Sequence, residues 1–146
     1  MAALGTDVYQ ASVAAAAHLA DESLPGPRRI ELMVHDLAAS VRRLHYLYRA
    51  MLDARRHSAA IREMWDSNLE SFVAPMAQYI DGERQAGRAP AGPDSGSLAG
   101  LLLRLSDRTL ESLGPQETPE DRQRMNTLAT IWARSIYGAA DDPGEP

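Results

Sequence analysis

The sequence predicts an all-α fold, a helical bundle of five to six helices, and three observations support this prediction. Apolar residues recur at intervals of three and four along most of the chain, as on one face of an α-helix. No stretch shows the sustained alternation of apolar and polar residues that is typical of a β-strand. Proline and glycine fall between the periodic segments, where they end helices.

The first half of the chain predicts three helices. The first is expected over about residues 6–21, after a disordered start at residues 1–5, because its alanine-rich stretch favours helix. Prolines at positions 25 and 27 end it. The second is expected over residues 28–44, where one apolar stripe consists of Ile30, Met33, Val34, Leu37, Val41 and Leu44. A short helix at about residues 46–55 either continues the second or follows a slight break.

The longest helix is expected to begin after Ser58, a good N-cap, and to end before Gly87. At 1.5 Å per residue it would span roughly 43 Å. Pro75 lies in its interior and should bend it, because proline removes one backbone hydrogen bond. Its apolar stripe consists of Ile61, Met64, Trp65, Leu69, Phe72, Val73, Met76 and Ile80.

Two further helices are expected after a loop at residues 87–96. The segment 97–113 is dense in leucine on nearly all sides, which indicates more than one buried face and often a second subunit. Thr118, followed by proline and two acids, is a strong start signal for the last helix, which Gly138 ends. Residues 6–138 are thus expected to form one domain, and residues 139–146 a disordered acidic tail.

Composition excludes several classes of function. The formal net charge is −5 and all 15 basic residues are scattered arginines, so direct DNA binding by this chain is not expected. Cysteine is absent, and the four histidines form no metal signature, so no metal or cofactor is expected. No apolar run reaches the ~20 residues of a membrane span, and no signal peptide is visible, which predicts a cytoplasmic protein without a membrane partner.

The end of the chain resembles a known family. The run Ser106-Asp107-Arg108-Thr109-Leu110, the pairs Thr127-Leu128 and Ile131-Trp132, and the closing Ser135-Ile136-Tyr137-Gly138 are similar to the C-terminal end of EthR-like TetR transcriptional regulators. Further upstream, Trp65, Ile80-Asp81, Glu83-Arg84 and Gly87 fall at matching positions of that family's long helix. The resemblance covers about residues 28–138, and the first helix only weakly.

The resemblance implies a sensor without catalysis. In that family an N-terminal helix-turn-helix domain binds an operator, and a helical C-terminal domain dimerises through its last two helices and holds a small molecule in an apolar pocket. This sequence corresponds to the C-terminal domain; a head would need about 50 residues before Thr6. We therefore expect a hydrophobic effector and a homodimer formed by residues 97–113 and 118–137, with Leu102 and Ile131 as candidate interface positions.

The resemblance also implies a set of ligand-binding residues. They are Val34, Leu37, Val41, Trp65, Leu69, Phe72, Met76, Tyr79, Leu103, Ser106, Asp107, Leu110 and Trp132. Related proteins carry asparagines where Leu103 and Ser106 stand, so this pocket should be less polar and its ligand does not follow from the family. Without the resemblance, the apolar members would be interpreted as ordinary core. Asp107 would be interpreted as an ion pair with Arg104 or Arg108.

Other functions stay open at this point. The chain could pair with a full-length TetR-type regulator as a heterodimer, sequester a ligand, or be a truncated copy. A less favoured class is a small helical enzyme with Asp107 as base and Tyr48 or Tyr79 nearby. The last alternative is a dimerisation module with a filled core and no ligand pocket.

Overall fold

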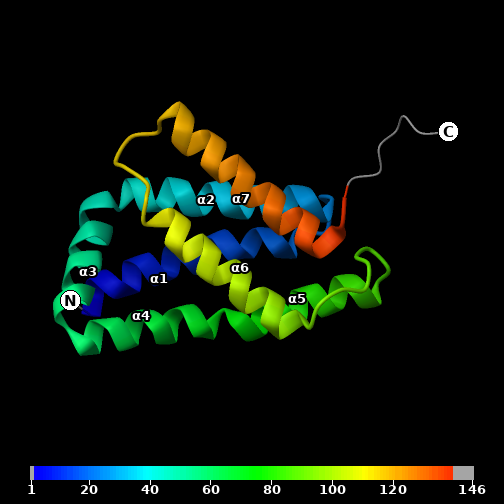
Figure 1. Cartoon of the computed structure of the whole chain (residues 1–146), viewed down its shortest axis with the longest axis horizontal. Helices are drawn as coiled ribbons and strands as arrows, with labels where there is room; N and C mark the ends of the chain where they lie inside the picture. The colour runs from blue at the N-terminus through cyan, green and yellow to red at the C-terminus, as the bar shows by residue number, and fades with distance from the viewer. Residues whose placement is uncertain (1, 140–146) are drawn as a thin grey trace.

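The computed structural model describes residues 2–139, and in this part of the chain all regular secondary structure is helical, without β-strands, as predicted (Figure 1). The elements are α1 (Ala2–Ala16), the 3-10 turn η1 (Ala17–Ala20), α2 (Gly26–Arg43), α3 (His45–His57), α4 (Ala59–Ser71), α5 (Val73–Gln85), α6 (Ser95–Leu110) and α7 (Pro119–Tyr137). When α4 and α5 are counted as the one long helix that was predicted, the described residues form six α-helices, in agreement with the predicted all-α bundle of five to six helices.

The first helix is displaced from its predicted position. It begins at Ala2 instead of Thr6 and ends at Ala16, and residues 17–20 tighten into a 3-10 turn. The expectation of a disordered start at residues 1–5 is therefore wrong for residues 2–5, whose backbone is helical. Met1 lies outside the described residues, as does the predicted acidic tail apart from Ala139.

The predicted helix boundaries hold where side chains cap the backbone. Ser58 accepts a hydrogen bond from the Ile61 amide at 3.3 Å, and Thr118 accepts one from the Asp121 amide at 3.1 Å. Gly87 and Gly138, which follow α5 and α7, have φ values of 75° and 81°. α6 begins two residues before its predicted start, because Asp94 accepts from the Ser97 amide at 2.9 Å and caps the helix there.

Two breaks shape the bundle. Leu44, with φ −99° and ψ 24°, separates α2 from α3, so the chain turns there instead of continuing as one helix. Phe72 separates α4 from α5. Pro75 explains the second break, since it has no amide to donate to the Ser71 carbonyl and its ring presses on that carbonyl. The predicted bend is thus a division of the helix at Phe72.

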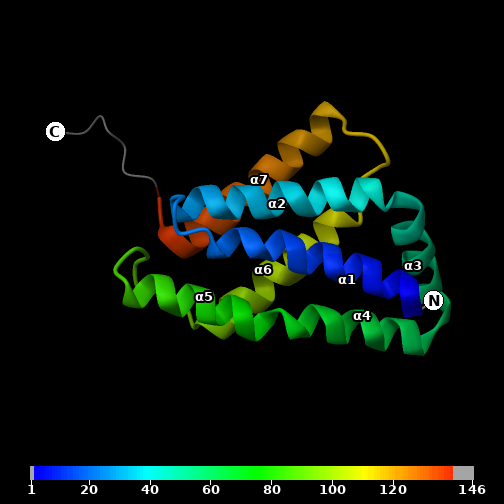
Figure 2. The same ribbon diagram turned by 180° about the vertical axis from the view of Figure 1, so that it is seen from behind.

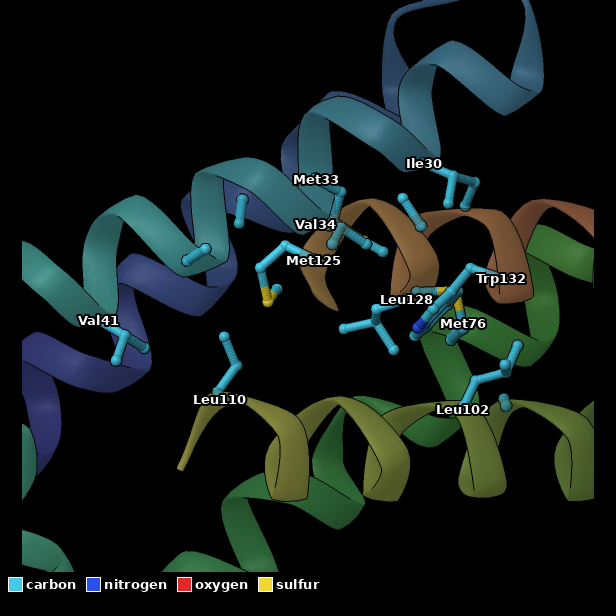
Figure 3. Close-up of a cluster of buried hydrophobic side chains, with 14 of the residues drawn as sticks. Ile30, Met33, Val34, Val41, Met76, Leu102, Leu110, Met125, Leu128 and Trp132 are labelled. Atoms are coloured by element: carbon cyan, nitrogen blue, oxygen red, sulfur yellow. The ribbon is translucent and has the colours of Figure 1, made fainter. Parts of the chain in front are cut away.

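The helices enclose a continuous apolar core. α2 packs against α7, and α5 packs against α6. α6 runs obliquely across the face of the molecule seen in Figure 1, and α1 lies beside α2 on the face seen in Figure 2. Figure 3 shows the core between α2, α6 and α7, where Ile30, Met125, Leu128 and Trp132 are at most 3% exposed. None of the helices in the described part is long and apolar enough to cross a bilayer.

Candidate functional site

A cavity of about 140 Å³ lies inside the bundle. Every α-helix of the described residues contributes at least one side chain to its wall. Its lining is mostly aliphatic and aromatic, with a few polar groups, which is the composition of a small-molecule site.

The structure brings most of the predicted binding residues to this cavity. Eleven of the thirteen line it: Leu37, Val41, Trp65, Leu69, Phe72, Met76, Leu103, Ser106, Asp107, Leu110 and Trp132. They come from five helices and from the break at Phe72, so their meeting is a property of the fold and not of one helix face.

The other two predicted residues, Val34 and Tyr79, do not line the cavity. Val34 is 1% exposed and belongs to the core between α2 and α7 (Figure 3). Its neighbour Met33 lines the cavity, because successive residues of a helix point about 100° apart. Tyr79 lies beyond the cavity on α5, where its hydroxyl donates to Glu83 at 3.3 Å.

Several lining residues were not predicted. α1 contributes Val8, Tyr9, Ala11, Ser12 and Ala16, and α3 contributes Tyr48 and Met51; Met33, Ser40, Leu44 and Asn68 complete the wall. The resemblance was weak over the first helix, so it carried no pocket residues there. Tyr48, Met51 and Leu52 are spaced as one apolar face, and this signal could have identified α3.

Both buried indoles have hydrogen-bond partners at the cavity. Trp65 donates to Asp107 at 3.0 Å, which ties α4 to α6. Trp132 donates to the Ser106 hydroxyl at 2.8 Å, and that hydroxyl donates to the Leu102 carbonyl at 2.8 Å. The two tryptophans therefore serve the core and the cavity wall together, since each indole is satisfied and each ring also faces the cavity.

Asp107 does not form the ion pair that its sequence neighbours suggest. Arg104 pairs with Glu70 at 3.7 Å, and Arg108 pairs with Glu111 at 3.0 Å. Burial raises the pKa of Asp107, while the hydrogen bond from Trp65 acts in the opposite direction. The carboxylate thus faces the cavity with an indole as its hydrogen-bonded partner and with no salt bridge among the described residues.

Tyr48, which also lines the cavity, has an unsatisfied hydroxyl. The residue is 4% exposed, and its hydroxyl has no hydrogen-bond partner among the described residues. Its ring lies 5.6 Å from that of Trp65. Burial raises the pKa of Tyr48, and the negative charges of Asp107 and Glu111 raise it further, so the hydroxyl stays protonated at neutral pH.

A second candidate surface lies on the outer faces of α6 and α7. Leu101, Leu105 and Ile131 are 67%, 40% and 41% exposed. Leu102, expected above as an interface position, is 4% exposed and packs inside the core, so that assignment is wrong; its neighbour Leu101 is the exposed leucine there. Within the described residues, no three His, Asp or Glu side chains lie together as metal ligands would.

The comparisons with known proteins agree with this architecture. The family model described as "Transcriptional regulator EthR, C-terminal domain" matches residues 30–138. The HTH-type transcriptional regulator EthR of Mycobacterium tuberculosis (strain H37Rv) is 35% identical over 92 residues, and that of Mycobacterium bovis has the same identity. The EthR of Mycolicibacterium smegmatis is 32% identical over 92 residues.

These matches cover 62% of this chain but only 43% of the M. tuberculosis protein and 42% of the M. smegmatis protein. The chain therefore corresponds to less than half of the relatives that it matches. The family model, by contrast, covers most of the chain. The chain belongs to the family of the C-terminal domain of the TetR-type transcriptional regulator EthR.

Proposed function

We propose that this chain is the effector-binding and dimerisation domain of a cytoplasmic transcriptional regulator, and that its cavity binds a hydrophobic small molecule. The observation that carries the proposal is the cavity itself. An efficiently packed domain of this size would fill such a space with side chains. Here Phe72, Leu103, Trp132 and their neighbours surround it instead.

Binding, and not catalysis, accounts best for the polar groups of the cavity. An enzyme using Asp107 as base would need a nucleophile whose proton Asp107 accepts. The hydrogen-bonded partner of Asp107 is the Trp65 indole, which is not a nucleophile, and the Tyr48 hydroxyl has no hydrogen-bond partner among the described residues. Ser106 is held between Trp132 and the Leu102 carbonyl. These groups are arranged to hold a ligand, and no pair among them resembles a nucleophile with its base.

The dimer would form through the outer faces of α6 and α7. The exposed side chains Leu101, Leu105 and Ile131 lie on two helices that contact each other. A two-fold axis beside them would bury the same patch from both copies, as in most homodimers. A heterodimer with a full-length relative would use the same patch.

Native mass spectrometry of the purified chain tests both parts. A dimer that retains a small molecule supports the proposal, and a ligand-free monomer contradicts it. 1-Octanol then serves as a neutral probe in calorimetry. Leu103→Trp should abolish its binding by filling the cavity, whereas Ala60→Trp, at an exposed position of α4, should not.

The interface is tested separately by sedimentation velocity. Leu101→Arg should convert the dimer to a monomer, because a charge would be buried without a partner. Tyr46→Arg is the matched control, since Tyr46 is 90% exposed but lies on α3, away from the patch. If both variants remain dimeric, the α6–α7 interface is wrong.

A further inference from the structure

The cavity contains a single charged side chain. Of the described residues that line it, only Asp107 has a carboxyl, amino or guanidinium group; the other polar groups are hydroxyls, indoles and one amide. A carboxylate in apolar surroundings is costly unless an opposite charge or several hydrogen bonds compensate it. Asp107 has one hydrogen bond, from Trp65 at 3.0 Å. The cost of burying the Asp107 carboxylate is therefore only partly offset by its hydrogen bond.

Arg55, a cation whose charge acts on Asp107, is already engaged. Arg55 donates to Glu111 at 2.6 Å, and its guanidinium lies 4.8 Å from the centre of the Trp65 ring. Asp107, Glu111 and Arg55 together carry a net charge of −1. Arg108 also reaches Glu111, but its side chain is 83% exposed, so water and salt screen its charge. The wall thus retains an excess negative charge at Asp107.

The groups around this charge favour a cation with an apolar body. Tyr48, buried and with a free hydroxyl, offers an oxygen that accepts a hydrogen bond. Tyr9 and Phe72, with rings 5.4 Å apart, and Tyr48 and Trp65 add aromatic faces to the wall. Such faces attract cations, and the remaining aliphatic wall fits a hydrocarbon chain.

We propose that the ligand of this cavity is a hydrophobic amine. Its ammonium group binds between the Asp107 carboxylate and the Tyr48 hydroxyl, and its hydrocarbon part packs against the aliphatic wall. This proposal rests on the proposed function, that the cavity holds a small molecule. It adds the charge of that molecule: an alkylamine with a pKa of about 10.4, like lysine, is protonated at neutral pH and supplies the missing positive charge.

The test compares n-octylamine with 1-octanol by calorimetry at neutral pH. The two probes share a hydrocarbon chain and differ in charge. The wild-type chain should bind octylamine at least about tenfold more tightly, because a hydrogen bond to a charged group is stronger than a neutral one. Asp107→Asn should weaken octylamine binding about tenfold and change octanol binding less than about threefold, since the amide oxygen can still accept from Trp65.

Two further variants locate the effect. Asp66→Asn removes a charge at an exposed position next to Trp65 that does not line the cavity, and it should preserve the preference for octylamine. Tyr48→Phe removes only the hydroxyl and should weaken octylamine binding severalfold. An unchanged affinity in Tyr48→Phe overturns the role of that hydroxyl.

The outcomes separate this proposal from the one on which it rests. Equal binding of both probes, or a preference for octylamine that survives Asp107→Asn, overturns the amine proposal and leaves the cavity as a neutral binding site. Failure of both probes to bind the wild-type chain overturns the proposed function together with it.

Discussion

Two carboxylates inside this domain have opposite surroundings. Glu83, on α5, is 2% exposed and accepts from Tyr137 at 2.8 Å, from Arg88 at 2.6 Å and from Arg29 at 3.4 Å. Asp107, on α6, has the Trp65 indole as its one hydrogen-bond partner among the described residues, and the unsatisfied Tyr48 hydroxyl lines the same cavity. Both are acids on helices next to aromatic residues, yet only the first has its full set of partners.

The pKa values of the two carboxyl groups are shifted in opposite directions, as their different surroundings predict. Burial alone would raise the pKa of Glu83, but the hydrogen bonds from Tyr137 and Arg88 outweigh it and the pKa is lowered. For Asp107 burial prevails and the pKa is raised. A satisfied buried charge holds elements together, whereas an unsatisfied one beside a cavity is a place for a ligand.

The largest expected effect comes from breaking the Glu83 cluster, which consists of Glu83 and its partners Arg29, Arg88 and Tyr137. Glu83→Gln should lower the free energy of unfolding by about 3 kcal/mol, because it leaves the buried Arg29 without a counter-charge. Urea denaturation measures this loss. Glu70→Gln breaks the exposed pair with Arg104 and should change stability by less than about 1 kcal/mol. Equal losses in the two variants would show that the Glu83 cluster does not anchor the fold.

A smaller effect comes from disturbing the same cluster through Gly26. A Cβ there would overlap the ring of Tyr137, which donates to Glu83. Gly26→Ala should therefore cost about 1–3 kcal/mol. Gly82→Ala, on α5 with open space around it, should instead stabilise by about 0.5–1 kcal/mol. Thermal unfolding of the two variants measures the difference. A gain of stability in both would mean that the Tyr137 ring moves aside freely.

At Asp107 the expected cost is small. Asp107→Asn should change the free energy of unfolding by less than about 1 kcal/mol, because the fold disfavours this charge and the amide keeps an acceptor for Trp65. The urea measurement used for Glu83→Gln applies here as well. A loss as large as that of Glu83→Gln would mean that Asp107 is a structural group and not part of a binding site.

The smallest effect is a difference in pH dependence. The lowered pKa of Glu83 contributes stability that is present above its unfolded value of 4.5 and is lost as pH falls through the folded value. The raised pKa of Asp107 imposes a penalty that is relieved as pH falls toward 3.8. The advantage of wild type over Glu83→Gln should shrink on acidification, while wild type should gain relative to Asp107→Asn. Slopes of the same sign would contradict the comparison.

Local chemistry explains which parts of this molecule the sequence could predict. Ser58, Thr118, Gly87 and Gly138 mark helix ends through their own backbone or side chain, so those boundaries were predicted correctly. The break at Leu44 has no glycine, proline or side-chain cap to mark it, so the sequence left it open. The start of α1 lacks a capping signal and was placed four residues too late.

The candidate site depends on partners far apart in the chain. Asp107 meets Trp65 from another helix, although its neighbours Arg104 and Arg108 suggested a local pair. Val34 and Met33 are adjacent, yet only Met33 faces the cavity. The three-and-four spacing of apolar residues places both on the buried face and does not tell which of the two neighbours lines a cavity. The contribution of α1 follows from how that helix packs on α2, which no single segment encodes.

The division of the long helix at Phe72 separates the two regions compared above. α4 contributes Trp65 to the cavity wall, whereas α5 contributes Met76 to the wall and carries Glu83 beyond it. Helical order propagates cooperatively along an unbroken hydrogen-bond ladder, and proline at position 75 removes a rung where the two segments meet. The chain therefore places the Trp65 part of the cavity wall and the Glu83 cluster in two helical segments, each with its own hydrogen-bond ladder, along one stretch of sequence.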